Sequence, residues 1–359
     1  MDKVLLVSAL YKFKSKTDFS LYIERANDLI SNTYCDMVVF TEASIVDVLV
    51  KRNNLTIIIL EASEWESNKF AKEEEFYEQI PNFRICFWVW DELDIKMIKI
   101  YMEKHIFVNR AIDAFPNYKY YIWNDIGVKS KPVRLFKKYL SSYPDISKID
   151  SMNLGDKICF QMRRYPTQEE KNKKIQLSID GIASIIGGAI IVGNKNAWRT
   201  FKILYRRSID YFKLNNLFWG NDEPVYFNVI MKNPNNATAV YTVNPTLVNG
   251  IITSDCNFFG YFGAYALFSG DSNFKLTLFD NPIYKLNGNI KEATWGAGSQ
   301  YSDVTNIIRN LPPNTNILLD NFIFPDDPAS GKFKTLYVQY ENGKVDEVNE
   351  YEVFSINPS

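Results

Sequence analysis

One aromatic run in the chain stops abruptly in polar residues and a glycine: Tyr118-Lys119-Tyr120-Tyr121-Ile122-Trp123-Asn124-Asp125-Ile126-Gly127. A run so rich in aromatic side chains is typical of a β-strand. If the strand ends near Asn124, the carboxylate of Asp125 stands at its carboxyl end, the edge where open α/β sheets build their ligand sites. The run therefore predicts a ligand site, and the partners of Asp125 must come from other parts of the chain.

Strand-like and helix-like segments alternate before this run. A continuous apolar stretch at 3–10 predicts a strand that is buried on both faces, and 36–41 and 55–60 predict a second and a third strand. Apolar residues at steps of three and four predict a helix over about 19–30 and a longer helix over 92–114. This order is the pattern of an α/β fold, in which helices cover a sheet.

Two later stretches carry residues of kinds that bind ligands. Gly187 and Gly188 open an apolar run that ends at Gly193. Paired glycines let a backbone approach a ligand or another strand closely, and a β-bulge is the alternative that involves no ligand. Asp222 and Glu223 precede a short helical segment. They are either first-turn acids that complement the helix dipole or carboxylates that bind a hydroxyl group and take its proton.

The helix over 92–114 adds three candidates. Asn109 and Arg110 come shortly before the aromatic run, so they could reach its carboxyl edge. There the planar donors of Arg110 would suit a phosphate group, and a surface ion pair is the alternative. His105, the one histidine of the chain, lies on the apolar stripe of this helix. It is either a core residue that a neighbour such as Asn109 satisfies or a ligand for substrate or metal.

The length and the change of pattern along the chain indicate two domains. A chain of 359 residues is long for one core. Residues 1–272 carry the α/β pattern, whereas short β-prone runs between turn residues replace helical periodicity in 273–359. We therefore expect a small C-terminal all-β domain at 273–359, of a β-sandwich-like accessory type.

The composition excludes some partners. The formal net charge is -1, from 41 basic and 42 acidic residues, which disfavours nucleic acid as a partner. The four cysteines form no closely spaced pair, as expected of free thiols in a reducing compartment. No segment approaches the length of about 20 apolar residues that spans a bilayer. We expect a soluble, cytoplasmic protein without a transmembrane segment.

Taken in order, the three stretches resemble a family of nucleotide-sugar glycosyltransferases of the GT-A fold, the HtrL/YibB type. That family combines an N-terminal strand with a W-x-D-x-G element, a strand that opens with paired glycines, and an acidic pair before a helix. The matching elements here are 123–127, 187–193 and 222–223, and the resemblance covers roughly residues 1–245. It implies a GT-A-like fold, which is a Rossmann-like mixed sheet flanked by helices.

The resemblance also implies roles for the candidate residues. Asn124 and Asp125 would belong to the motif that binds the diphosphate, with Asp125 holding Mn²⁺ or Mg²⁺. Gly127 stands where the common motif has its second acid, which weakens this metal site. Mg²⁺ nevertheless accepts one carboxylate together with substrate phosphates. The remaining implied contacts are Ser8, Ala9 and Tyr11 near the base and ribose, Gly187 and Gly188 beside the donor sugar and acceptor, and Asp222 and Glu223 facing sugar hydroxyls as catalytic groups.

The implied activity is the transfer of a sugar from a UDP- or GDP-sugar to a hydroxyl of a glycan or glycoconjugate. The first alternative is a non-catalytic glycan-binding protein with a degenerate transferase domain, which the missing second acid favours. A structural interaction protein is the third possibility.

Overall fold

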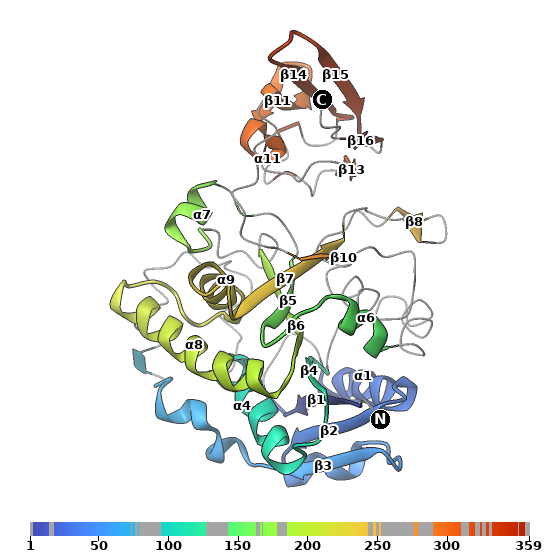
Figure 1. Cartoon of the computed structure of the whole chain (residues 1–359), viewed down its shortest axis with the longest axis vertical. Helices are drawn as coiled ribbons and strands as arrows, with labels where there is room; N and C mark the ends of the chain where they lie inside the picture. The colour runs from blue at the N-terminus through green and yellow to red at the C-terminus, as the bar shows by residue number, and fades with distance from the viewer. Residues whose placement is uncertain are drawn as a thin grey trace.

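The aromatic run forms an inner strand of an eight-stranded sheet in the computed structural model of the chain (Figure 1). In the order of the sheet, the strands are β10 (Leu276–Leu278), β7 (Ala237–Thr242), β5 (Ile158–Met162), β6 (Ile186–Gly193), β4 (Tyr120–Asn124), β1 (Val4–Leu10), β2 (Asp36–Thr41) and β3 (Leu55–Ile59). Apart from a few single residues, the structure describes residues 3–13, 18–72, 74–75, 95–126, 143–162, 168–177, 185–242, 247–248, 251–252, 276–278, 290–309, 316–319, 332–350 and 352–355.

The direction of the strands changes at β6. β3, β2, β1 and β4 are parallel to one another, and β6 is antiparallel to both of its neighbours, β4 and β5. β5 is parallel to β7, and β10 closes the edge in the antiparallel direction. Because β1 lies between β2 and β4, the strand order reverses there. Such a switch point opens a crevice outside the carboxyl ends of the strands, where ligands bind.

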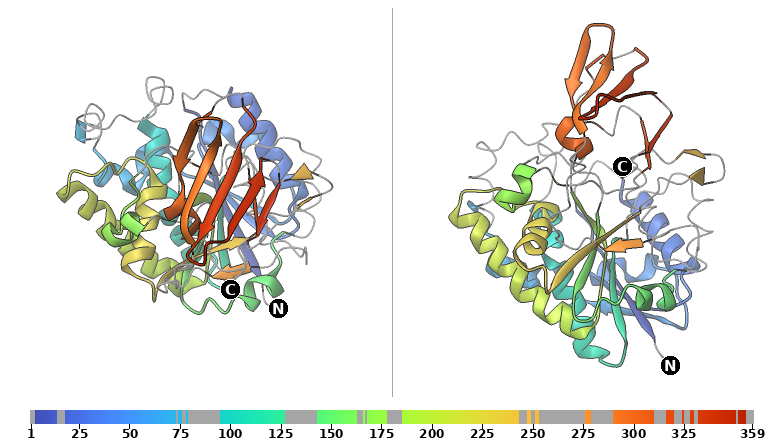
Figure 2. Two further views of the ribbon diagram at one scale, coloured as in Figure 1. Left: turned by 90° about the horizontal axis from the view of Figure 1, so that it is seen from above. Right: turned by 45° about the horizontal axis from the view of Figure 1, so that its top comes forward.

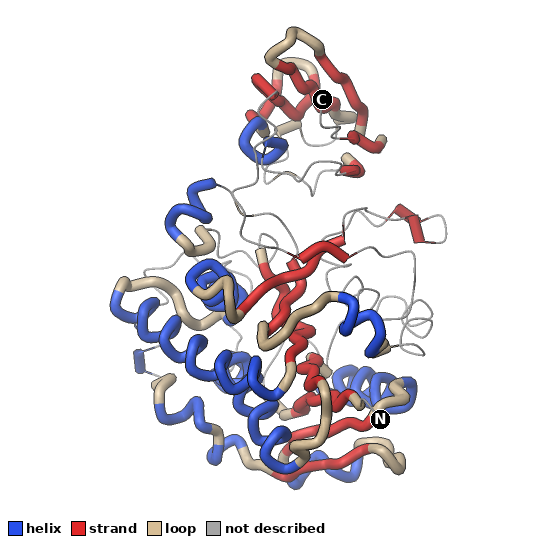
Figure 3. Tube along the Cα trace, in the orientation of Figure 1, coloured by secondary structure: helices blue, strands red, loops and turns tan. Residues whose placement is uncertain are grey.

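Helices cover both faces of this sheet, as Figures 2 and 3 show. Leu5 and Val7 of β1 belong to the core beneath α4, α8 and α9, and Val4 and Leu6 belong to the core beneath α1 and α6. Every residue of β1 is buried, as expected of a strand covered on both faces. The helices are α1 (Phe19–Asn32), α4 (Ile95–Ala114), α6 (Ile146–Ser151), α7 (Gln168–Lys173), α8 (Lys195–Leu214) and α9 (Asp222–Lys232), with 3-10 helices η1 (Ala43–Val48), η2 (Ala62–Glu64) and η3 (Glu66–Lys69).

A second, smaller β-structure follows with its own core around Trp295, Leu336 and Val338. Its four-stranded sheet has the order β12–β11–β14–β15, beside a two-stranded pair of β13 and β16. The elements are β11 (Ile290–Ala297), β12 (Gln300–Asp303), α11 (Thr305–Arg309), β13 (Asn316–Leu318), β14 (Thr335–Tyr340), β15 (Val345–Asn349) and β16 (Val353–Ser355); a short hairpin of β8 (Leu247–Val248) and β9 (Ile251–Ile252) precedes them.

The structure confirms the predicted fold class, a mixed α/β sheet flanked by helices with a small C-terminal all-β sheet. One strand of the segment 273–359 pairs differently from the expectation of a separate accessory domain: Leu276–Leu278 joins β7 of the large sheet. The large sheet therefore includes residues beyond position 272, and the domain boundary stays a prediction.

A β-bulge is present at the paired glycines. Phe160 of β5 pairs with Ile191 of β6, but the next residue, Gln161, pairs with Gly187. Residues 188–190 thus have no partner in β5, and Asp125 instead donates its backbone N–H to the carbonyl of Ala189 at 2.8 Å. The bulge turns this part of β6 toward the end of β4.

His105 is a core residue between α4 and α8. Its ring centroid lies 4.6 Å from that of Tyr205 and 6.0 Å from that of Phe201. Burial, helped by the nearby cations Lys202 and Arg206, lowers the pKa of His105 to about 3. The imidazole is therefore neutral at pH 7, which matches the core alternative for this residue.

This buried imidazole makes stability depend on pH. Its pKa in the folded chain lies below its unfolded value, so the unfolded state binds more protons as pH falls below about 6.5. Lowering the pH from 7 to 5 should therefore cost about 2 kcal/mol of unfolding free energy at this residue. Urea denaturation of the native chain and of His105→Gln at both pH values measures the difference. An equal loss in the two proteins would contradict the assignment.

Candidate functional site

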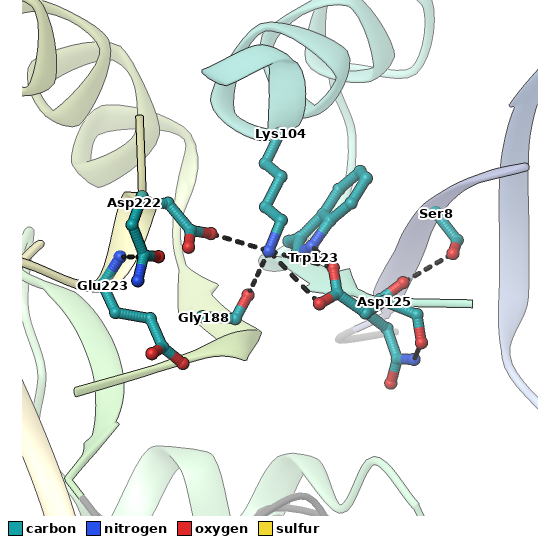
Figure 4. A network of polar contacts seen from close by, with 9 residues as sticks. Ser8, Lys104, Trp123, Asp125, Gly188, Asp222 and Glu223 are labelled. Atoms are coloured by element: carbon teal, nitrogen blue, oxygen red, sulfur yellow. Dashed lines mark hydrogen bonds and ion pairs between the residues drawn. The ribbon is translucent and has the colours of Figure 1, made fainter. Parts of the chain in front are cut away.

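The side chain of Lys104 reaches from α4 to the carboxyl end of β4, where it contacts two acids (Figure 4). Its Nζ lies 3.1 and 3.2 Å from the two carboxylate oxygens of Asp125 and 2.8 Å from Oδ2 of Asp222. It also donates to the carbonyl of Gly188 at 2.9 Å. We call Lys104, Asp125, Gly188 and Asp222 the Lys104 cluster.

The direction of α4 explains why Lys104 arrives there. A short connection joins α4 to β4, so the helix runs back along the strand and its middle lies beside the strand's carboxyl end. Lys104 lies about ten residues before the end of α4, which is about 15 Å of helix. The 5 residues of β4 extend over about 16 Å. The two lengths match, and Lys104 comes level with Asp125.

Asp125 is the most exposed side chain of the Lys104 cluster, at 27% against 5% for Asp222 and 4% for Lys104. Its Oδ1 accepts a hydrogen bond from Trp123 Nε1 at 2.7 Å. Burial raises the pKa of Asp125, and the negative charge of Asp222 adds to this, while Lys104 and the Trp123 hydrogen bond oppose it. Asp125 is thus a fixed carboxylate that solvent still reaches.

Asp222 approaches through the space that Gly188 leaves open. It lies in the first turn of α9, where a negative charge suits the helix dipole. Asn221 caps that helix by accepting a hydrogen bond from Glu223 N–H at 3.3 Å. A Cβ at Gly188 would lie 2.7 Å from Oδ2 of Asp222 and 3.1 Å from the Tyr226 ring. Paired glycines permit a close approach to the backbone. Here the side chain of Asp222, from the same protein, approaches Gly188 in this way.

Ser8 and Asn124 join the ends of β1 and β4. Ser8 Oγ donates to the backbone carbonyl of Asn124 at 2.5 Å, and Tyr143 Oη donates to Asn124 Oδ1 at 3.1 Å. Both Ser8 and Asn124 are fully buried. They fix the strand ends on which Asp125 stands.

The other residues expected near the nucleotide have buried side chains. Ala9 belongs to the core beneath α4. Tyr11 donates its hydroxyl to the carbonyl of Leu60 at 2.8 Å and packs against Trp65 and Phe107. Burial raises the pKa of Tyr11 above its ordinary value. With their side chains buried, Ala9 and Tyr11 offer only backbone atoms at the carboxyl end of β1.

Asn109 and Arg110 do not reach Asp125, contrary to the expectation. Asn109 Nδ2 donates to the carbonyls of His105 and Trp198, at 2.7 and 3.2 Å. Arg110 donates to the carbonyl of Glu64 at 3.3 Å. The reason is the antiparallel course of α4, whose last turns lie beside the beginning of β4.

Glu223 and Gly187 lie next to the Lys104 cluster in the chain but outside its contacts. In Figure 4 the Glu223 carboxylate points away from Lys104, whereas that of Asp222 points toward it. Gly187 pairs with Gln161 in the sheet. Of the residues expected at the site, the structure brings together Asp125, Asp222 and Gly188. The contacts of these residues with a ligand remain predictions.

Lys104 is the residue that sequence reasoning missed. The pattern does contain a signal: Lys104 shares a helical stripe with Ile100, Phe107 and Ala111, at steps of four, three and four. These three residues are buried. A lysine on a buried apolar stripe requires an acidic partner, because an isolated buried ammonium group is strongly unfavourable.

The divalent cation expected at Asp125 competes with this ammonium group. Both oxygens of Asp125 and Oδ2 of Asp222 already contact Nζ. Among the described residues, no group of three or more His, Cys, Asp or Glu side chains is arranged to hold a metal. Gly127 lies outside the described residues. These donors do not fit a metal ion beside Lys104, and the metal at Asp125 stays a prediction.

Replacing Gly188 with alanine tests the close approach of Asp222. The added Cβ would force the carboxylate away from Lys104, so Gly188→Ala should lower the unfolding free energy by about 1–3 kcal/mol. Urea denaturation measures this. The matched control is the same substitution in a chain that already carries Asp222→Ala, where the loss should shrink. Equal losses in both backgrounds would show that Asp222 is not the residue displaced.

Every helix within the described ranges is too short or too polar to cross a membrane. No protein-family model and no curated protein matches the chain. Among solved structures it is similar to a glycosyltransferase involved in the glycosylation of the major capsid of PBCV-1, with a TM-score of 0.28 and 13% identity. The match covers 56% of this chain and 64% of that one, less than two thirds of its length. A similarity of this size carries no argument about function.

Proposed function

We propose that this chain is a glycosyltransferase that moves a sugar from a nucleotide-sugar donor to a hydroxyl of a glycan or glycoconjugate. The observation that supports it best is the position of Asp125, a partly exposed carboxylate at the carboxyl end of β4, next to the switch point beside β1. This is the edge at which α/β sheets bind nucleotides. The resemblance of the three sequence stretches to nucleotide-sugar transferases supplies the donor class.

The chemistry needs a carboxylate that reaches the reacting hydroxyl. In the transfer step the acceptor oxygen bonds to the anomeric carbon, the bond from that carbon to the diphosphate breaks, and the hydroxyl proton leaves. A carboxylate accepts such a proton best when its pKa approaches the operating pH. Burial raises the pKa of Asp125 in this direction. Asp125 is therefore the acid of the Lys104 cluster that contacts the substrate. Asp222 acts on Asp125 through Lys104.

The proposed donor and acceptor come from the resemblance of the three sequence stretches. A UDP- or GDP-sugar is the expected donor, and its diphosphate is the leaving group. The expected acceptor is a glycan or glycoconjugate with a free hydroxyl. Glu223 and the backbone of Gly187 and Gly188 remain the predicted neighbours of the sugars.

Turnover of a nucleotide-sugar panel by the purified full chain tests the proposal. We expect release of UDP or GDP with at least one donor, and a decrease of about 100-fold or more in Asp125→Asn, because a positioned acid–base group contributes at least that factor. Asp47→Asn is the matched control, since Asp47 is an exposed acid of η1. Equal turnover in the native chain and Asp125→Asn would contradict the assignment of the site.

A glycan-binding protein without transferase activity remains the second candidate, because of two tyrosines on the small sheet. Tyr301 and Tyr337 lie with ring centroids 5.9 Å apart, and Tyr301 is 42% exposed. Tyr337 alternates along β14 with the buried Leu336 and Val338, so it faces away from the small core. Calorimetry separates the two candidates. Binding of UDP or GDP favours the enzyme, and glycan binding without nucleotide binding favours the second candidate.

A further inference from the structure

The ammonium group of Lys104 donates two hydrogen bonds, to Asp125 and to the Gly188 carbonyl, and forms an ion pair with Asp222. An ammonium has three N–H donors. Here the acceptors within 3.2 Å are the carboxylate of Asp125, that of Asp222 and the carbonyl of Gly188. The ring of Tyr101, one turn earlier on α4, lies with its centroid 5.1 Å from Nζ. Lys104 is thus held in one place by groups from β4, β6 and α9.

Two acids at one position, of which Asp222 is buried and Asp125 is partly exposed, favour a cation between them. Asp125 and Asp222 both contact Nζ of Lys104, and taking an ionised carboxylate out of water is unfavourable unless an opposite charge is close. Burial alone would lower the pKa of Lys104, but Asp125 and Asp222 together outweigh it and raise the pKa above its ordinary value. Lys104 therefore remains a cation at physiological pH and neutralises one of the two negative charges.

A divalent metal ion would meet the same need in a different geometry. Mg²⁺ requires oxygen ligands at about 2.0–2.1 Å in an octahedral arrangement. The oxygens of Asp125 and Asp222 surround Nζ at 2.8–3.2 Å, which suits an N–H···O contact. A metal in that position would have to expel Lys104 and draw both carboxylates inward by about 1 Å. The arrangement is built for an ammonium.

We infer that Lys104 is a built-in counter-ion that takes the place of a divalent cation between Asp125 and Asp222, so that the native site takes up no metal there. The identity of the substrate rests on the proposed function, whereas the place of the cation rests on the contacts of Lys104 alone. Two consequences follow. Glycosyl transfer at this site does not require a divalent metal, and removing the Lys104 charge creates a metal site.

Titration with Mn²⁺ alone, followed by electron paramagnetic resonance, tests the inference without any substrate. For the native full chain we expect no Mn²⁺ binding at Asp125. The Mn²⁺ titration curves of the native chain and of Asp125→Asn should therefore be the same. For Lys104→Ala we expect a new site at least 10-fold tighter than any in the native chain, lost again in Lys104→Ala combined with Asp222→Asn. Mn²⁺ binding by the native chain that depends on Asp125 would overturn the inference, as would the absence of a new site in a folded Lys104→Ala chain.

Folding of the variant is controlled separately. Lys104→Met keeps most of the side-chain volume and removes the charge together with its N–H donors, so it serves if Lys104→Ala does not fold. Circular dichroism reports whether each variant is folded. The measurement on the native chain needs no Lys104 variant and decides the inference even if both are unfolded.

Donor turnover in excess EDTA tests the catalytic consequence. We expect turnover within 2-fold of that measured with Mn²⁺, and a loss of 10-fold or more in EDTA would overturn the inference. If no donor is turned over under either condition, the proposed function fails. The Mn²⁺ titration then still decides whether Lys104 occupies the cation position between Asp125 and Asp222. Failure of the proposed function is therefore distinguishable from failure of the inference.

Discussion

The contact between the Lys104 ammonium and two carboxylates holds the edge of the sheet together. It joins four elements: α4, the end of β4, the bulge of β6 and the first turn of α9. Removing one partner of a buried ion pair typically costs about 3–5 kcal/mol, because the other charge is left uncompensated. Lys104 therefore compensates the negative charge where Asp125 and Asp222 meet.

The fold prepares this contact in two ways. The strand order reverses beside β1, β1 and β4 are parallel neighbours whose carboxyl ends lie at the same edge of the sheet, and Ser8 joins these two ends. The bulge in β6 then places Gly188 where a side chain would collide with Asp222. The missing Cβ and the irregular strand let a helix terminus approach a strand end closely. Local departures from regular structure are thus concentrated where the acids meet.

Part of this site could be predicted from the sequence. The strand that ends at Asn124, the paired glycines and the acid in the first turn of α9 each carry a local pattern, and their order along the chain resembles that of a known family. Lys104 carries a weaker pattern, because a charge on an apolar helical stripe becomes informative only once the direction of the helix is known. The same geometry explains the error at Asn109 and Arg110: α4 runs antiparallel to β4, so its middle, not its end, lies beside Asp125. The burial of Tyr11 depends on Trp65 and Phe107, which no local pattern links to it.

A crystal structure of the native chain grown in the presence of Mn²⁺, with anomalous diffraction recorded at the manganese edge, tests the central claim most directly. The account predicts that Nζ of Lys104 lies within about 3.2 Å of Asp125, Asp222 and the Gly188 carbonyl, as expected of N–H···O contacts, with no anomalous peak among them. An anomalous peak bound to Asp125, with Lys104 turned away from both acids, would contradict it.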